Sequence, residues 1–194
     1  GATPKASAAK NQKAINTAIS ICAKKGGGRV IVPAGTFNTG AITLKSNVNL
    51  EIQKDAKLVF VFDKKLYPIV KTRWEGMDCM NYSPCIYAYN EKNVAITGDG
   101  TIDGSGSNET WWKWCGKDRF GWTPDLKESQ KIGRPKLFEY SEAELPVEQR
   151  NMNGMGMRPQ LINIYQCENV AIKNVTLLRS PFWVIHPLLS KNIT

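Results

Sequence analysis

The chain has 194 residues, of which 42% are apolar, and it carries a formal net charge of +9 from 26 Lys and Arg against 17 Asp and Glu. This length and apolar content suit one globular domain and exclude a disordered chain, and no apolar run approaches the roughly 20 residues that cross a bilayer. The basic charge favours nucleic acid, an anionic surface or an acidic polysaccharide as a partner, unless it only solvates the surface. No helix-turn-helix, zinc-finger or RNA-binding signature is present, so we expect no nucleic-acid partner and no membrane partner.

The cysteines give no metal-binding signature. There are five of them, an odd number, and no two form a C-x-x-C pair. Only Cys79 and Cys85 lie close enough in the sequence to suggest a local disulfide. We therefore expect no metal and no cofactor.

The first predicted element is an amphipathic helix from Ala6 to Lys25. Its apolar residues recur at helical spacing, and three glycines, Gly26 to Gly28, follow it. Glycine accepts the left-handed conformation that ends many helices, so the helix is expected to stop there.

After this helix the sequence becomes a succession of short predicted strands. "RVIVPAGTF" is rich in β-branched residues, and "NVNLEI" alternates apolar with polar residues, which is the period of a half-buried strand. Similar phrases recur as "KNVAITG", "ENVAIKN" and "KNIT". Their asparagines are Asn47, Asn93, Asn169 and Asn192, with gaps of 93 − 47 = 46, 169 − 93 = 76 and 192 − 169 = 23.

These gaps predict a solenoid. We interpret the first gap as two units of 23, the last as one unit, and the middle one as a unit plus an insertion of 53 residues. Leucine-rich repeats have a similar period, but their L-x-x-L-x-L pattern is missing. Turn asparagines and β-branched strands favour an all-β fold, a right-handed single-stranded parallel β-helix, with the first helix capping its open end.

The insertion, from about residue 107 to 157, differs in composition from the rest. It holds four tryptophans, Trp111, Trp112, Trp114 and Trp122, followed by a charged stretch and "NMNGMGMRP". The aromatic rings either pack the insertion onto the solenoid or line a carbohydrate cleft, and packing is the more common role. A loop of this length is more often functional than decorative.

Several stretches resemble a known enzyme family. They are "GGGRVIVPAGTFNTGAITLKSNVNLEI", "RWEG", "VAITGDGTIDGSG" and "RPQLINIYQCENVAIKNVTLLRSPFWVIHP". In this order they resemble the N-terminal half of the polygalacturonases, glycoside hydrolase family 28, in its bacterial form. The resemblance implies a right-handed parallel β-helix that hydrolyses α-1,4-galacturonosyl linkages of pectin with inversion. It also implies an acidic polysaccharide substrate, polygalacturonate or a related pectin, and a secreted or periplasmic protein.

The four catalytic motifs of that family are absent from this sequence. Asn-Thr-Asp, Asp-Asp, Gly-His-Gly and Arg-Ile-Lys do not occur. Asp99 and Asp103 flank glycines in "GDGTIDG", where aspartates usually fix turns. We therefore expect no catalytic residue in these 194 residues, an inactive chain on its own, and catalytic aspartates beyond Thr194.

Three residues are candidates for binding substrate. The forked guanidinium of Arg158 suits a uronate carboxylate, although it could instead only anchor the insertion. In "SPFWVIHP", strand alternation is expected to bury Phe182 and Val184 and to turn Trp183 towards a groove as a platform for a sugar ring. The same alternation would turn His186 inwards, where turn carbonyls would satisfy it.

The domain prediction is one parallel β-helix over residues 1–194, incomplete at its C-terminal end. An uncapped solenoid exposes apolar core and strand edges, so we expect a C-terminal half or a second chain to complete it. The insertion favours exo-action, because it could close the end of the cleft that binds the non-reducing side of the polymer. Two alternatives remain: a non-catalytic β-helical carbohydrate-binding or structural fragment, and a β-helical pectate lyase, for which no acidic calcium cluster is visible.

Overall fold

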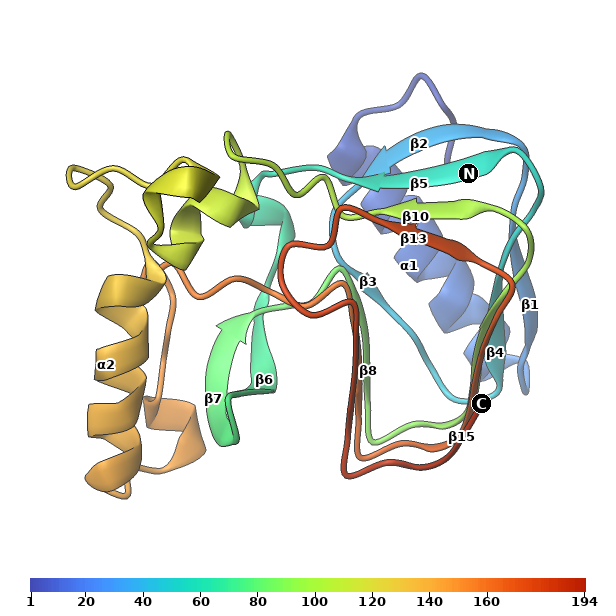
Figure 1. The fold of residues 1–194 in the computed structure, drawn as a ribbon. Coiled ribbons are helices and arrows are strands. Elements are labelled where there is room, and N and C mark those ends of the chain that lie inside the picture. The colour runs from blue at the N-terminus through green and yellow to red at the C-terminus, as the bar shows by residue number, and fades with distance from the viewer.

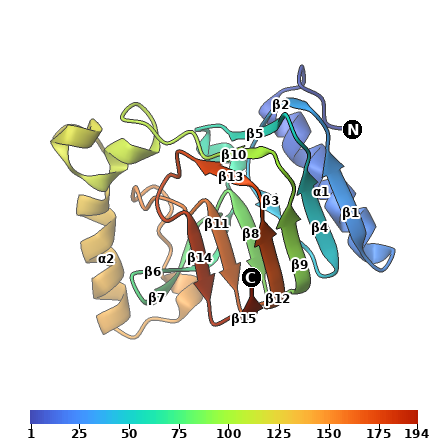
Figure 2. The ribbon, with the colours of Figure 1, turned by 45° about the vertical axis from the view of Figure 1, so that its right-hand side comes forward.

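The computed structural model describes residues 1–194 as a coil of short strands that form three parallel sheets (Figures 1 and 2). The first sheet contains β1 (Gly28–Val32), β4 (Val48–Ile52), β9 (Lys92–Thr97), β12 (Glu168–Lys173) and β15 (Lys191–Ile193). The second contains β2 (Gly35–Thr39), β5 (Ala56–Phe60), β10 (Thr101–Asp103) and β13 (Thr176–Leu178). The third contains β3 (Ile42–Thr43), β8 (Ile86–Tyr89), β11 (Ile162–Tyr165) and β14 (Ile185–Leu188).

Each turn of the coil contributes one strand to each sheet, and this arrangement confirms the predicted parallel β-helix. Alternate side chains point into the coil, so β4 and β5 both show a buried, half-buried alternation. Equivalent inward residues stack in register from rung to rung, as Leu50 does on Ile96 and Leu58 does on Ile102. The stacked residues form one continuous apolar core.

The predicted helix is present as α1 (Ala8–Lys24), and it covers the N-terminal end of the coil. Ser7 caps its first turn, and Ile15 and Ile19 are buried against the first rung. The side chain of Gln12 donates to the carbonyl of Leu66 at 2.6 Å, which also ties the helix to the start of the loops that follow β5. The helix therefore closes the apolar core at this end.

The asparagines of the repeat form a ladder of side-chain hydrogen bonds along one edge of the coil. Asn93 donates to Asn47 at 2.8 Å, Asn169 to Asn93 at 3.0 Å, and Asn192 to Asn169 at 2.9 Å. All four have positive φ angles, between 54° and 63°, which asparagine tolerates better than most residues. Because Asn47 and Asn93 lie on adjacent rungs, the 46-residue gap is one lengthened rung, and its interpretation as two units was wrong.

The extra residues of the long rungs leave the coil at the same place, between the second and third sheets. We call this place the loop corner. The hairpin of β6 (Ile69–Trp74) and β7 (Met77–Tyr82) leaves between β5 and β8. The larger excursion leaves between β10 and β11 and carries four helical segments: η2 (Trp111–Cys115), η3 (Asp118–Phe120), α2 (Gln130–Glu142) and η4 (Val147–Gln149). A short helix, η1 (Lys64–Leu66), precedes the hairpin.

The tryptophans of the insertion mainly pack it onto the coil. Trp111 and Trp114 are buried in the main core and contact Phe62 edge to face. Trp112 donates its indole N–H to the carbonyl of Ser180 at 2.8 Å. The packing alternative is therefore correct for these three rings, and none of them lines an open cleft.

The local disulfide between Cys79 and Cys85 does not form. All five cysteines are free thiols. Cys79 lies in a small apolar cluster with Trp74 and Leu137, between the hairpin and α2, whereas Cys85 belongs to the main core. The two side chains point into different cores, which explains why sequence proximity was misleading.

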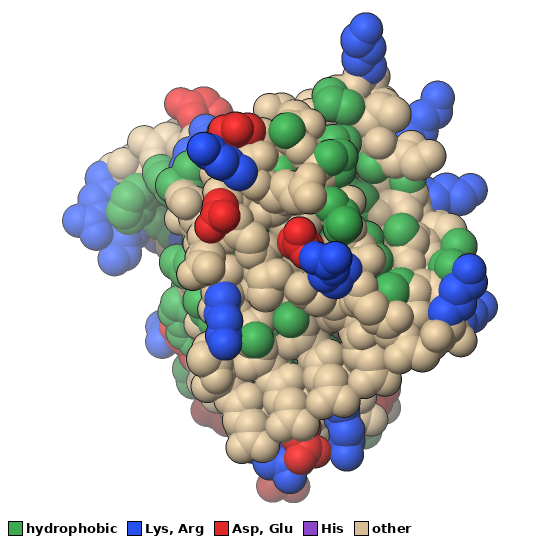
Figure 3. Space-filling view, turned by 90° about the vertical axis from the view of Figure 1, so that its right-hand side faces the viewer, with side chains coloured by type: hydrophobic (Ala, Val, Ile, Leu, Met, Phe, Trp, Pro, Cys, Tyr) green, Lys and Arg blue, Asp and Glu red, His purple; other side chains and the backbone are tan.

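The basic charge is not concentrated on the face that carries the first sheet. In Figure 3, Lys and Arg side chains are scattered over this side of the molecule, and several lie beside acidic side chains. Ion pairs such as Arg29 with Glu51 and Lys92 with Glu168 link adjacent strands of that sheet. No helix is long and apolar enough to cross a membrane.

Candidate functional site

Segments from three successive rungs meet at the loop corner. The first is the hairpin, whose tip is Glu75 and Gly76. The second is the insertion, and the third is the short turn of residues 179–184 between β13 and β14. Since rungs stack in register, loops that leave the same corner are forced to lie beside one another. The candidate site is built where these loops touch.

The hairpin covers the outer face of the third sheet along the lower rungs. The hydroxyl of Tyr87 donates to the carbonyl of Lys71 at 2.5 Å, and Thr72 contacts the amide of Asn163 at 3.4 Å. Tyr87, Asn163 and Tyr165 point out of the coil but are buried beneath this hairpin. Along this sheet, the outer face is open only from β14 onwards.

A polar cluster joins the hairpin to the third sheet beside this boundary. Asp78 accepts hydrogen bonds from Arg73 and from the hydroxyl of Tyr165, both at 2.7 Å. Burial alone would raise the pKa of Asp78, but these two partners hold it below its usual range. Burial and the hydrogen bond to Asp78 raise the pKa of Tyr165 to about 12. Asp78 is therefore a fixed anion and not a proton donor.

Four rings form a continuous series from the hairpin to β14, which we call the ring series. Trp74 stacks on Phe182 with centroids 4.6 Å apart, and Phe182 stacks on Trp183 at the same distance. Trp183 in turn contacts the ring of His186 at 4.3 Å. Trp74 is buried and Trp183 is 38% exposed, so the series leads from a core to the surface.

The predicted orientation of the "SPFWVIHP" segment was wrong. Val184 is 45% exposed, and Phe182 packs between Trp74 and Trp183 outside the coil. The strand begins only at Ile185, which is in register with the buried Ile162, so the alternation assumed for the preceding residues does not exist. His186 is in register with Asn163 and therefore faces outwards.

The hydrogen bonds of His186 select one tautomer. The amide nitrogen of Asn163 lies 3.2 Å from Nδ1 of His186 and 2.9 Å from its carbonyl oxygen. With the amide donating, Nδ1 is the acceptor and Nε2 carries the hydrogen. Burial, and secondarily the charge of Arg73, lowers the pKa of His186, so the ring stays neutral at neutral pH.

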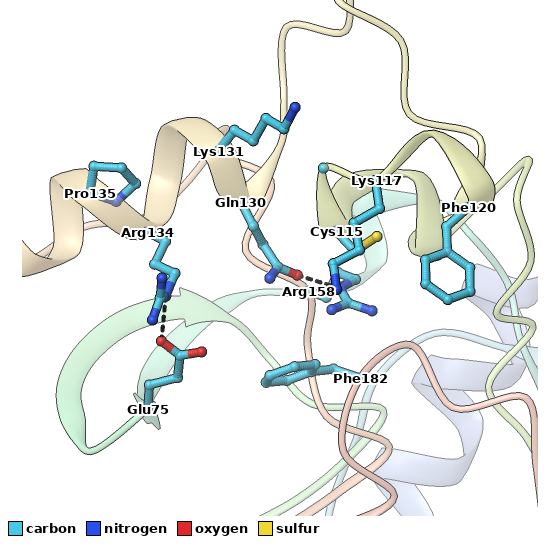
Figure 4. Close-up of a pocket in the computed structure, with 11 residues that line it drawn as sticks. Glu75, Cys115, Lys117, Phe120, Gln130, Lys131, Arg134, Pro135, Arg158 and Phe182 are labelled. Carbon is cyan, nitrogen blue, oxygen red and sulfur yellow. Dashed lines mark hydrogen bonds and ion pairs between the residues drawn. The ribbon is translucent and has the colours of Figure 1, made fainter.

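A cationic cavity of about 580 Å³ lies on the other side of Phe182, as Figure 4 shows, and we call it the Arg158 pocket. Its walls come from the hairpin tip, the η2–η3 segment and the first turns of α2. Four of its residues are basic and one is acidic: Lys117, Lys131, Arg134, Arg158 and Glu75. Glu75 is already paired with Arg134 at 2.6 Å.

Arg158 occupies the centre of this pocket. It donates to the side chain of Gln130 and, at 3.2 Å, to the carbonyl of Pro181, and its guanidinium lies 4.8 Å above the ring of Phe182. None of these partners carries a negative charge. Arg158 therefore anchors the insertion, as one alternative held, and also presents an uncompensated cation to the cavity.

The carboxylates of the coil do not form a catalytic pair. Asp103 is fully buried and accepts from the backbone of Ser105, which confirms its predicted role in a turn. It is also paired with Arg179 and Lys57, so its pKa falls to about 2 in spite of burial. A general acid needs a raised pKa, which neither Asp78 nor Asp103 has. No cluster of three or more His, Cys, Asp or Glu could hold a metal ion.

Comparison with known proteins decides the family. The model of the glycosyl hydrolases family 28 matches residues 22–182, which is most of the chain. The chain belongs to this family. The resemblance drawn from the sequence motifs is therefore confirmed.

Individual members of family 28 give the same result. The chain is 44% identical to the solved structure of a hyperthermoactive exopolygalacturonase from Thermotoga maritima, with a TM-score of 0.90, over 94% of this chain and 41% of that one. It is 32% identical to a probable polygalacturonase from Vitis vinifera, over 94% of this chain and 32% of the relative. It is also 32% identical to an exo-poly-alpha-D-galacturonosidase from Dickeya chrysanthemi, over 88% and 30% respectively. The chain thus spans about a third of the length of the curated relatives it matches.

The structure brings the three predicted binding residues into one neighbourhood. Trp183 and His186 touch directly, and Arg158 reaches them through Phe182. Sequence reasoning missed Phe182, which it assigned to the core, and it missed the hairpin residue Arg73. The motif "RWEG" had marked the hairpin tip as part of the family resemblance, but nothing in its spacing showed that it would meet the turn of residues 179–184.

Proposed function

We propose that this chain is the N-terminal half of an exo-acting polygalacturonase, which removes sugars from one end of polygalacturonate with inversion. Trp183 and His186 bind a sugar ring at the entrance of the groove, and Arg158 contacts a carboxylate beyond it. The substrate is an acidic polysaccharide, galacturonan or a related pectin of the cell wall. The protein acts outside the cytoplasm, either secreted or in the periplasm.

The observation that carries this proposal is the closed end of the third sheet. The hairpin buries the outward side chains of β8 and β11, and α2 is fastened to the hairpin through the ion pair of Arg134 with Glu75. A polymer that lies along the outer face of this sheet meets this wall next to His186. It can enter only with a chain end, which is the requirement of exo-action.

The catalytic aspartates belong on rungs beyond those described here. The last rung exposes apolar residues that its predecessors bury: Ile185 is 43% exposed, whereas Ile162, one rung earlier, is fully buried. A further rung would cover Ile185 and would extend the open face that begins at His186. The inverting acid and base would then face the polymer just past the Trp183 platform. We propose that the same polypeptide, or a second chain, supplies this rung.

The experiment is a time course of polygalacturonate hydrolysis by the full-length protein. We expect mono- or digalacturonate from the earliest times, a β-anomer as the first product by NMR, and little loss of viscosity. Oligomers of intermediate length at early times would refute exo-action. Products that absorb in the ultraviolet would indicate a lyase, and binding without any cleavage would indicate a non-catalytic binding protein.

A further inference from the structure

The Arg158 pocket is continuous with the platform of the proposed groove. Phe182 lines the pocket with one part of its ring and stacks on Trp183 at 4.6 Å. A sugar that lies beside Trp183 is therefore one ring away from the guanidinium above Phe182. The pocket lies on the closed side of the groove, between the hairpin tip and α2.

Arg158 is an unbalanced charge in this pocket. Its Nε and Nη1 atoms are engaged by an amide oxygen and a backbone carbonyl, and Nη2 has no protein partner. Burial lowers the pKa of Arg158, although an arginine stays protonated at neutral pH. A partly buried cation without a counter-ion is unfavourable unless a ligand supplies the charge. The free side of the fork has the geometry that a carboxylate fits.

The other residues of the pocket favour the same kind of ligand. Lys117 makes no ion pair, and Lys131 lies 3.4 Å above the ring of Trp122, which orients the ammonium without neutralising it. Phe120 and Phe182 supply flat apolar surfaces on which the C–H face of a sugar can rest. The volume of about 580 Å³ lies within the range of small-ligand sites.

We propose that the Arg158 pocket recognises the free carboxylate of the uronate at the closed end of the groove, and thereby discriminates against a methyl-esterified chain end. This inference rests on the proposed function, because it assumes a uronate polymer in the groove. A methyl ester removes the charge that Arg158, Lys117 and Lys131 attract. Charge-assisted hydrogen bonds contribute about 1.5–3 kcal/mol, which corresponds to a difference in affinity of about 10- to 100-fold.

The test is a binding measurement with two ligands that contain no glycosidic bond. The full-length protein is titrated calorimetrically with galacturonate and with the methyl ester of galacturonic acid. We expect galacturonate to bind at least about 10-fold more tightly than the ester. In the R158Q variant this ratio should fall to about 1, and in K117Q the affinity for galacturonate should fall by about 2- to 5-fold.

The matched control is Lys127→Gln. Lys127 is an exposed cation on the same insertion, so its loss changes the net charge equally, but it does not line the Arg158 pocket. Its affinity ratio should equal that of the unaltered protein. If R158Q does not fold, as judged by circular dichroism, K117Q and K131Q carry the test, because both side chains are exposed.

The outcomes separate this inference from the proposed function. Equal affinity for galacturonate and its ester in the unaltered protein would overturn the pocket even if polygalacturonate is hydrolysed. Unchanged galacturonate binding in R158Q or, where that variant fails, in K117Q and K131Q would overturn it as well. A protein that does not hydrolyse polygalacturonate, but binds galacturonate through Arg158, would refute the proposed function and support the pocket.

Discussion

Asp103 should be the ionisable group with the largest effect on the acid stability of the coil, and Asp103→Asn tests this. Its carboxylate is fully buried and is held by Lys57 at 2.9 Å, by two hydrogen bonds from Arg179 at 2.8 and 2.5 Å, and by the amide of Ser105 at 3.0 Å. Arg179 begins the turn that carries Phe182 and Trp183. The same contacts therefore stabilise the coil and position the ring series.

The size of the effect follows from the pKa of Asp103. Its pKa is lowered from 3.8 to about 2 in the folded protein, since the bonds from Arg179 and Lys57 outweigh the opposing effect of burial. A difference of about 1.8 pKa units corresponds to roughly 2.4 kcal/mol at pH 7. A folded pKa below the unfolded value means that this stability is present above pH 3.8 and is lost as the pH falls towards 2. The contribution should fall to about 1.3 kcal/mol at pH 3 and to less than about 0.5 kcal/mol at pH 2.

The assay is urea unfolding of the native protein and of D103N at pH 7, 3 and 2. We expect D103N to lose about 2–3 kcal/mol at pH 7, and the two proteins to converge as the pH approaches 2. Glu51→Gln is the control, since Glu51 pairs at 3.0 Å with an Arg29 side chain that is 66% exposed and should contribute less than about 1 kcal/mol. A loss at pH 7 no larger than that of E51Q, or a loss that is the same at pH 2, would refute the reasoning.

Three further predictions concern single side chains. Trp183→Ala should weaken binding of oligogalacturonates by about 2- to 12-fold, and should change the free energy of unfolding by less than about 1 kcal/mol, because the ring is partly exposed; unchanged affinity would make Trp183 a packing residue only. His186 should titrate below pH 6.5 in an NMR experiment, because burial and Arg73 disfavour its charged form, and a midpoint above 6.5 would contradict the neutral tautomer. Asn93→Ala should cost about 2 kcal/mol in urea unfolding, since it removes two ladder hydrogen bonds and places alanine at a φ of 54°. Asn93→Gly should cost less, because glycine adopts that φ freely; a stable N93A variant would show that the ladder contributes little.

The sequence predicted the coil well because its determinants are local and repeated. Alternation in "NVNLEI" and the glycines after α1 each depend on a few neighbouring residues. The turn asparagines also marked the correct edge, and Asn47, Asn93, Asn169 and Asn192 do stack there. Their spacing misled only where a rung was lengthened, because a gap of 46 residues is equally compatible with two short rungs or one long rung.

The site could not be predicted to the same degree, because it depends on which loops meet. Phe182 follows a proline in a segment that is not yet a strand, so its side chain answers to Trp74 of the hairpin and not to strand alternation. The helix α2 was missed for a related reason: Pro135 lies within it, and its apolar residues are few. Arg158 was recognised by its chemistry alone, and its lack of a counter-ion became visible only when Gln130 and Pro181 were placed beside it.

One property of the fold links these observations. Because rungs stack in register, an insertion at a given corner always lies over the same sheet, whatever its length. The hairpin and the larger insertion both leave between the second and third sheets, so each closes the third sheet on the side of the earlier rungs and leaves the later rungs open. The direction of the closed end therefore follows from the order of the insertions in the chain. Moving such an insertion to a later rung would close the other side of the open face, and the enzyme would then have to approach the polymer from its opposite end.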